Sequence, residues 1–125
     1  MADKILYIVT GPPGSGKTTY ANQFPELQVY DHDLGNKLGW HSATTDAILC
    51  TSAPNQKTKE YWASEARKRG FTPKIVVMWC TRMEAMQRMM SRSGQAATER
   101  NDLQANVHRW FDLYSAHPLE KKVSL

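Results

Sequence analysis

The chain has 125 residues, which is enough for one domain with one hydrophobic core and too few for a second catalytic domain. Hydrophobic residues make up 41% and charged residues 22%, as is ordinary for a soluble protein, and no apolar run approaches the ~20 residues that span a bilayer. Residues 1–4 carry no secretory signal, so we expect a cytoplasmic protein. The net charge of +4 favours ligands that bear phosphate groups, nucleic acid among them.

The stretch at residues 11–18, Gly-Pro-Pro-Gly-Ser-Gly-Lys-Thr, fits the P-loop pattern G-x-x-x-x-G-K-[ST] at every fixed position. An apolar, β-rich run at residues 5–9 precedes it, and residues 17–24 can open a helix behind it. The glycines let backbone N–H groups surround an anion, and the helix adds the positive end of its dipole. Lys17 would bind the β- and γ-phosphates, and the Thr18 hydroxyl would bind Mg²⁺. The pattern predicts a nucleoside triphosphate site made of Gly11, Pro12, Pro13, Gly14, Ser15, Gly16, Lys17, Thr18 and Thr19.

Strands and helices are predicted to alternate along the rest of the chain. Further strands are expected at residues 27–30, 47–50 and 74–79, and a polar connection containing Gly35 and Gly39 covers residues 34–45. Helices are expected from Pro54-Asn55 to Arg69, from the capping-box spacing at Thr81 to Ser91, and from Thr98 onward. In the last helix the large apolar side chains fall on one face at 3.6-residue spacing.

This alternation predicts an α/β fold: a P-loop NTPase domain like that of nucleotide kinases, with helices on both faces of a sheet. We expect three layers around a four-stranded parallel core of order 2-3-1-4, with the domain at 1–115 and a loose C-terminal tail at 116–125. Ligands of such sheets bind beyond the carboxyl ends of the strands. These ends offer, besides the P-loop, the segments Asp31 to Asp33, Thr51-Ser52 and Cys80 to Arg82.

Phosphoryl transfer also needs a group that activates the acceptor and cations for the charge that builds on the transferred group. Asp33 or Asp31, at the end of the strand after the P-loop helix, could activate an acceptor hydroxyl; both could instead only cap a turn. Arg88 and Arg92 are four residues apart on a predicted helix, so they share a face and could close over the phosphates as a lid. They could equally form a solvated basic face.

Three further expectations concern single residue types. Cys50 and Cys80 each follow an apolar run without metal-ligand spacing, which is typical of buried thiols. Trp40 is a candidate stacking platform for a ligand and, with the segment 34–45, a candidate determinant of specificity. His117 has no partner in the sequence pattern and is expected on the surface.

The order of these motifs resembles the small P-loop kinases grouped around the phage 5′-hydroxyl polynucleotide kinases. The resemblance runs from about Ile5 to Tyr114 and rests on the loop at residues 11–19, an Asp after the second strand, Thr-Ser-Ala-Pro-Asn at 51–55, and Arg-x-x-x-Arg-x-Gly at 88–94. It implies that Asp33 is the general base and that Lys17, Arg88 and Arg92 act on the transferring phosphoryl group. It also implies ATP and Mg²⁺ as cofactors.

Two positions depart from that family's pattern. The family has Asp-x-x-Arg after the second strand, where the Arg binds an acceptor phosphate, but Asp33 is followed by Leu34-Gly35-Asn36. The family's Asp at the end of the third strand is replaced by Thr51. The segment at 34–45 is also short for an acceptor tunnel. The chain therefore matches the family's ATP-binding residues more closely than its acceptor-binding residues.

We therefore expect an ATP-dependent phosphotransferase, with the 5′-hydroxyl of a polynucleotide as its main predicted acceptor. One alternative is a kinase for a small molecule such as a nucleoside or nucleotide. Another is a nucleotide-binding ATPase module that transfers nothing. The sequence does not decide between ATP and GTP or between Asp31 and Asp33 as the base. It also leaves the oligomeric state open.

Overall fold

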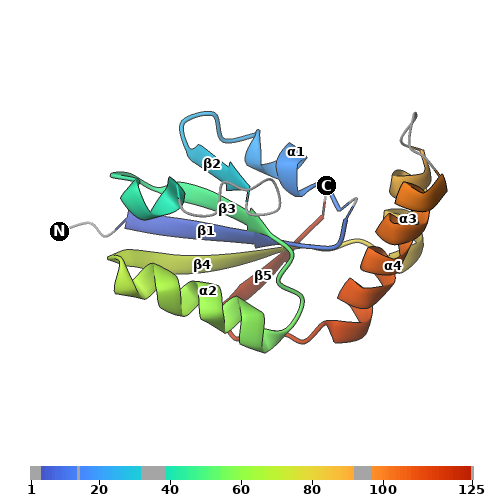
Figure 1. Cartoon of the computed structure of the whole chain (residues 1–125). Helices are drawn as coiled ribbons and strands as arrows, with labels where there is room; N and C mark the ends of the chain where they lie inside the picture. Colours follow the sequence, from blue (N-terminus) through green and yellow to red (C-terminus); the bar gives the residue numbers. More distant parts are fainter. Residues whose placement is uncertain (1–3, 14, 32–38, 92–96, 125) are drawn as a thin grey trace.

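Strands and helices alternate from Lys4 to Val123 in the computed structural model, which describes residues 4–13, 15–31, 39–91 and 97–124 (Figure 1). In chain order the elements are β1 (Lys4–Thr10), α1 (Lys17–Ala21), β2 (Gln28–Asp31), a 3-10 helix (Gly39–Ser42), β3 (Ala47–Thr51), α2 (Gln56–Lys68), β4 (Phe71–Met78), α3 (Arg82–Met90), α4 (Ala97–Leu113) and β5 (Glu120–Val123). The strands and helices predicted from the sequence are all present, with ends shifted by a few residues.

The sheet is parallel throughout and has the order β2-β3-β1-β4-β5. The predicted α/β fold and the order 2-3-1-4 are thus confirmed. Strand β1 is central: Thr10, its last residue, is the register partner of Thr51 in β3 and of Val77 in β4. The carboxyl ends of these three strands therefore meet at one edge of the sheet, directly before the P-loop.

A fifth strand corrects the predicted count of four. Strand β5 lies inside the segment 116–125, which the sequence predicted as a loose tail, and it pairs with β4 from Ile75↔Glu120 to Met78↔Val123. The sequence Glu-Lys-Lys-Val has no apolar run, so hydrophobic pattern alone does not indicate a strand. Its place in the sheet comes from backbone pairing with β4 and from contacts that Glu120 makes with distant residues.

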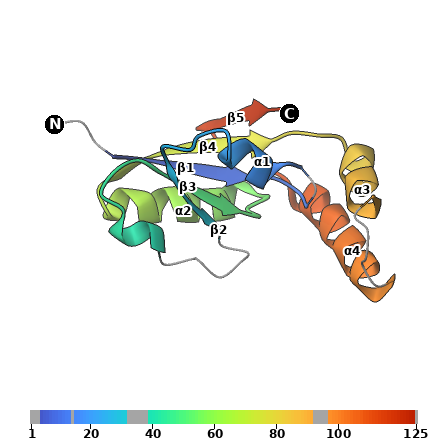
Figure 2. The ribbon, with the colours of Figure 1, turned by 90° about the horizontal axis from the view of Figure 1, so that it is seen from above.

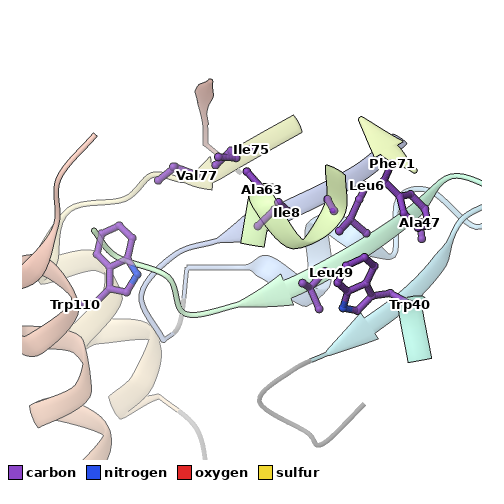
Figure 3. Close-up of a cluster of buried hydrophobic side chains, with 11 residues drawn as sticks. Leu6, Ile8, Trp40, Ala47, Leu49, Ala63, Phe71, Ile75, Val77 and Trp110 are labelled. Carbon is purple, nitrogen blue, oxygen red and sulfur yellow. The ribbon is translucent and has the colours of Figure 1, made fainter. Parts of the chain in front are cut away.

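The two faces of the sheet carry separate hydrophobic clusters, as a parallel sheet with helices on both sides requires. On one face, side chains of β1, β3 and β4 pack against Ala63 and Ala66 of α2, with Trp40 and Trp110 at opposite ends of the cluster (Figure 3). On the other face, Ala21 of α1 packs against a second set from the same strands. Because α1 has only five residues, that face is covered by a much shorter helix.

Helices α3 and α4 stand side by side beyond the carboxyl ends of β1 and β4 (Figures 1 and 2). Cys80, Ala85, Met89 and Val107 are buried between them. The predicted capping box is present: Thr81 Oγ1 accepts from the Glu84 N–H, and the Glu84 carboxylate accepts from the Thr81 N–H. Helix α4 begins at Ala97, one residue before the predicted cap at Thr98.

A buried ionic cluster joins α2 to the C-terminal strand. Lys59 is fully buried, and its Nζ donates to the Ser115 carbonyl and to Glu120 Oε1, both at 2.7 Å. Tyr114 donates its hydroxyl to Glu120 Oε2. Among the described residues of α2, Lys59 is the buried charged residue, and Glu120 neutralises it. The same contact holds β5 in place beside β4.

His117 belongs to the same region and corrects the expectation that it lies on the surface. It is only 6% exposed, because its ring lies between Glu60 and the turn before β5. Its Nδ1 accepts from the Leu119 N–H at 3.0 Å, so the proton of the neutral ring sits on Nε2, 2.9 Å from Glu60 Oε1. The histidine therefore has a structural role in holding this turn.

Across the described part of the chain, every helix is too short or too polar to traverse a lipid bilayer.

Candidate functional site

The P-loop follows strand β1 at the carboxyl edge of the sheet, as predicted; Gly14 lies outside the described residues. The Ser15 N–H donates to the Pro12 carbonyl at 3.1 Å, which closes a turn. Gly16 has a φ of 95°, in the left-handed region that glycine adopts without strain. The chain can therefore reverse within a few residues between β1 and α1.

Gly11 has no room for a side chain. A Cβ atom there would lie 2.5 Å from Ser15 Oγ and 3.1 Å from the Met78 carbonyl oxygen. Ser15 is itself buried, so it has little room to move aside. The first glycine of the pattern thus allows the loop to pack closely on the end of β4.

Lys17 begins α1, and its side chain folds back over the loop. Its Nζ donates to the Gly11 carbonyl at 3.1 Å and to Ser52 Oγ at 3.3 Å. Both acceptors lie at the carboxyl edge of the sheet, and these two hydrogen bonds hold the ammonium beside the loop. An ammonium at this position lies beside the loop that the pattern predicts to bind phosphates.

The sequence predicts that Ser52 lies at the carboxyl edge of the sheet, but it indicates no role for this residue. It follows β3 directly, and the segment that carries it is tied to β1 because the buried Thr10 hydroxyl donates to the Ala53 carbonyl at 2.9 Å. This bond brings Ser52 to Lys17, 35 residues away in the chain. The sequence showed Thr51-Ser52 at a strand end, but no spacing rule linked either residue to the P-loop lysine.

The hydroxyl of Thr18, predicted as the Mg²⁺ ligand, belongs to an exposed residue in the first turn of α1. Among the described residues no three His, Cys, Asp or Glu side chains gather as a metal cage. Mg²⁺ at nucleotide sites is held by phosphate oxygens, waters and one or two protein oxygens rather than by such a cage. The hydroxyls of Thr18 and Ser52 fit that kind of site.

Arg88 reaches the P-loop from α3. Its Nη1 donates to the Ser15 carbonyl at 3.4 Å, across 73 residues of chain, and its Nη2 lies 3.8 Å from Glu84 Oε2 on the same helix. The structure therefore brings this predicted cation to the loop, as the lid hypothesis requires. The contact to a loop carbonyl distinguishes Arg88 from an ordinary surface arginine.

Three other predicted residues are not placed. Asp33 and Arg92 lie outside the described residues, and for Asp31 the structure describes the backbone, at the end of β2, but not the side chain. Strand β2 lies at the edge of the described sheet, next to β3, so that β3 and β1 separate it from β4. The choice between Asp31 and Asp33 as the base stays open, and both remain predictions, as does Arg92.

Three other residues singled out by the sequence are buried and do not serve the site. Trp40, predicted as a stacking platform, is fully buried and packs edge-on against Phe71 with 5.7 Å between ring centroids, so a ligand cannot stack on it. Burial raises the pKa of the Cys80 thiol, which therefore stays protonated and is a poor nucleophile. Cys50 is a buried free thiol, as expected.

The N-terminus of α2 also follows this edge, and two of its first three N–H groups are occupied. The Gln56 N–H donates to Ser115 Oγ at 2.7 Å, and the Thr58 N–H donates to Asn55 Oδ1 at 2.8 Å. The N-terminus of α3 is closed by its capping box. The P-loop, which fits the phosphate-binding pattern at every fixed position, is the candidate phosphate site at this edge.

No protein-family model matches the sequence, and no curated protein matches it. Solved structures of bacterial kinases are similar in fold. A gluconokinase from Sinorhizobium meliloti 1021 superposes with a TM-score of 0.70 at 12% identity, over 99% of this chain and 84% of that one. A sugar kinase from Janibacter sp. HTCC2649 superposes with a TM-score of 0.63 at 16% identity, over 98% of this chain and 84% of that one.

At this level of identity the likeness shows the fold, and the chain has the α/β fold of P-loop kinases. The P-loop kinase part of the resemblance stated from the sequence is thereby supported. Its narrower part, a phage polynucleotide kinase, is not shown by these structures and stays a prediction.

Proposed function

We propose that this protein is a phosphotransferase that moves the γ-phosphate of ATP to a hydroxyl group of a small acceptor. The observation that carries the proposal is the convergence of two cations on one phosphate-binding loop. Lys17 donates a hydrogen bond to the Gly11 carbonyl of the loop, and Arg88, from a different helix, donates one to the Ser15 carbonyl of the same loop. Transfer of a phosphoryl group needs such an arrangement, because charge spreads over its oxygens in the transition state.

Each residue has a role in this proposal. The loop N–H groups and Lys17 hold the β- and γ-phosphates, and Arg88 stabilises the charge on the group in transfer. Thr18 would hold Mg²⁺, which supplies further neutralisation of the phosphates when bound. By resemblance, Asp33 accepts the proton of the attacking hydroxyl and Arg92 assists Arg88.

A small acceptor is favoured over a polynucleotide for two reasons. Two of the structures with a similar fold are a gluconokinase and a sugar kinase, which by their names act on small hydroxylated molecules. The sequence also lacks the arginine that would bind an acceptor-strand phosphate three residues after Asp33. We therefore place a sugar or sugar acid first among the acceptors and nucleosides second.

The test is transfer of labelled γ-phosphate from ATP, with Mg²⁺, to a panel of acceptors. The panel holds sugars, sugar acids, nucleosides, nucleoside monophosphates and 5′-hydroxyl DNA and RNA oligonucleotides. Lys17→Ala and Asp33→Asn are the inactive controls. Label on a small acceptor, lost in both variants, is the expected result.

The other outcomes each exclude part of the proposal. Label on an oligonucleotide alone would restore the polynucleotide kinase prediction. Release of phosphate without a labelled acceptor would indicate an ATPase module. Asp33→Asn should abolish transfer with little change in ATP affinity, and loss of both together would contradict its role as base.

A further inference from the structure

Ser115, which follows the end of α4, uses its N–H, its hydroxyl and its carbonyl to contact one segment of the chain. The N–H donates to the Pro54 carbonyl at 3.1 Å, and the hydroxyl oxygen accepts from the Gln56 N–H at 2.7 Å. The carbonyl accepts from Lys59 Nζ at 2.7 Å. These partners belong to the loop after β3 and the first turn of α2. Because hydrogen bonds are directional, they fix both the position and the orientation of the end of α4.

The same loop is connected to the P-loop side of the site. The buried Thr10 hydroxyl, at the end of β1, donates to the Ala53 carbonyl at 2.9 Å. Ser52 Oγ accepts from Lys17 Nζ at 3.3 Å. The segment that Ser115 holds is therefore the segment that contacts the P-loop lysine.

The second cation of the site is connected to Ser115 through helices α3 and α4. Val107 of α4 and Met89 of α3 lie in one buried cluster, and the two helices stand side by side (Figure 2). Arg88 belongs to α3 and donates to the Ser15 carbonyl of the P-loop at 3.4 Å. Since the helices pack on each other, a change at the end of α4 should move Arg88 as well.

Two kinds of contact join α4 to the rest of the fold. Trp110 is buried in the cluster on the α2 face of the sheet and supplies apolar contact, which is not directional. Ser115 supplies hydrogen bonds, which lose strength steeply when the donor and acceptor are misaligned. The orientation of α4 should therefore depend on Ser115 more than its adhesion to the sheet does.

We propose that Ser115 is a positioning residue for phosphoryl transfer, which holds the α3–α4 pair so that the Arg88 guanidinium lies correctly relative to Lys17. The inference rests on the proposed function, because it takes the P-loop as the place of transfer. A misplacement of about 1 Å at a reacting group can cost 10²-fold in rate. Binding of ATP by the P-loop itself does not pass through α4. Loss of the Ser115 contact should therefore lower kcat and leave the KM for ATP nearly unchanged.

The test is steady-state kinetics of the full chain on the acceptor found in the panel, with kcat and the KM for ATP measured separately. Ser115→Ala removes the hydroxyl that accepts from the Gln56 N–H, and Ser115→Thr keeps a hydroxyl. Both are compared with the unaltered protein, and Ser115→Ala is also made in an Arg88→Ala background. Melting temperatures show whether each variant keeps the fold.

Two variants on α2 complete the set. Gln56→Pro removes the donor of the same hydrogen bond. Gln56 is the first residue of α2, where proline is well tolerated, and Asn55 before it has an extended backbone, with φ −104° and ψ 166°. Thr58→Ala is the matched control, because the Thr58 hydroxyl donates to Asn55 within the same turn.

Ser115→Ala should lower kcat about fivefold to tenfold and change the KM for ATP less than about twofold. Ser115→Thr should restore kcat, and Gln56→Pro should lower it at least as much as Ser115→Ala. In the Arg88→Ala background, Ser115→Ala should lower kcat no further, because the serine acts through the arginine. Thr58→Ala should leave kcat unchanged.

Three results would overturn the inference. The first is an unchanged kcat in Ser115→Ala, or in Gln56→Pro if only that variant folds. The second is a loss in Ser115→Thr as large as that in Ser115→Ala, and the third is the full loss from Ser115→Ala in the Arg88→Ala background. In each of these the unaltered protein still transfers phosphate, so the proposed function survives. Absence of transfer by the unaltered protein to every acceptor would exclude the proposed function together with the inference.

Discussion

Two lysines of this fold make the same kinds of contact with opposite results. Lys17 donates to a backbone carbonyl at 3.1 Å and to the Ser52 hydroxyl at 3.3 Å. Lys59 donates to a backbone carbonyl at 2.7 Å and to the Glu120 carboxylate at 2.7 Å, and its ammonium lies 4.4 Å from the centroid of the Tyr114 ring. Lys17 is half-buried beside the P-loop, and Lys59 is paired with a carboxylate in the interior.

The comparison separates a cation that binds from a cation that holds the structure together. A buried ammonium costs several kcal/mol unless a carboxylate pairs with it, so Lys59 needs Glu120. A partly exposed ammonium loses much less hydration, so the stability of the fold should depend far less on the contacts of Lys17. Substitution at Lys17 should therefore change activity alone, and substitution in the Lys59 cluster should change stability.

The largest expected effect is on activity at Lys17. Lys17→Met should lower kcat/KM for phosphoryl transfer about 10³-fold, because a cation at the developing charge is removed. The melting temperature should stay within about 2 °C of the unaltered protein, since Lys17 is only half-buried and lies at the edge of the sheet rather than in its core. Lys74→Met, at an exposed position in β4, is the matched control and should leave both values unchanged. A large loss of stability in Lys17→Met would contradict the comparison.

Next in size is the stability effect at Glu120. Glu120→Ala leaves the fully buried Lys59 ammonium without its carboxylate and should lower the free energy of unfolding by about 3 kcal/mol. The measurement is urea denaturation followed by circular dichroism. A double variant, Lys59→Met with Glu120→Leu, removes both charges and should recover most of the loss. A single variant within about 0.5 kcal/mol of the unaltered protein would show that the pair is not needed.

Arg88 should behave as Lys17 does, with a smaller effect. Arg88→Ala should lower kcat about 10²-fold while the fold is kept, because the guanidinium lies at the P-loop rather than in the core. Arg88→Lys should recover part of the rate, since an ammonium keeps the charge and loses the fork geometry. The check is steady-state kinetics on the acceptor found in the panel. Near-normal turnover in Arg88→Ala would show that Arg88 takes no part in phosphoryl transfer.

The pH dependence of stability should come from the same cluster as Glu120. Burial alone would raise the pKa of Glu120, but hydrogen bonds from Lys59, Tyr114 and the His117 N–H outweigh it, and the net pKa lies below the ordinary 4.5. Burial, and then the Glu120 carboxylate, raise the pKa of Tyr114, so its phenol remains a donor at any working pH. A carboxyl group whose pKa is lowered by folding stabilises the protein above its unfolded pKa.

That stabilisation is lost as the pH falls through the folded-state pKa of Glu120, below 4.5. Thermal melts of the unaltered protein and of Glu120→Gln between neutral pH and pH about 3 test this. The two should differ clearly at neutral pH and converge as the solution becomes acidic. A difference that stays constant over the whole range would exclude Glu120 as the source.

The smallest expected effect concerns local helix capping. Thr81→Ala removes the hydroxyl that accepts from the Glu84 N–H at 3.1 Å and should cost about 1 kcal/mol in the free energy of unfolding. Thr81→Ser keeps the acceptor and should cost much less. Equal loss in both variants, measured by denaturation, would mean that the capping hydrogen bond is not what stabilises α3.

The P-loop and the positions of the first four strands along the chain could be predicted because both depend on local sequence. Gly11 and Gly16 meet backbone demands that no other residue meets, and apolar runs mark the central strands. Strand β5 could not be predicted in the same way. Its one apolar residue, Val123, gives no period, and the contacts of Glu120 that hold it come from Lys59, 61 residues earlier.

The same reason explains the other differences. Trp40 follows a glycine in a polar segment, which is typical of an exposed loop, yet Phe71 and the core of the sheet bury it. His117 has no partner nearby in the sequence, and its partner Glu60 lies on α2. Ser52 meets Lys17 only because Thr10 ties β3 to β1. Each of these contacts is decided by tertiary packing, which no spacing rule contains.

The distance between Lys59 and Glu120 along the chain has a consequence for biosynthesis. A ribosome adds about 5–20 residues per second, so several seconds separate the appearance of the lysine from that of its carboxylate. During that interval α2 cannot settle on the sheet without burying an uncompensated ammonium. We therefore expect α2 to pack stably on the sheet only after β5 has been synthesised.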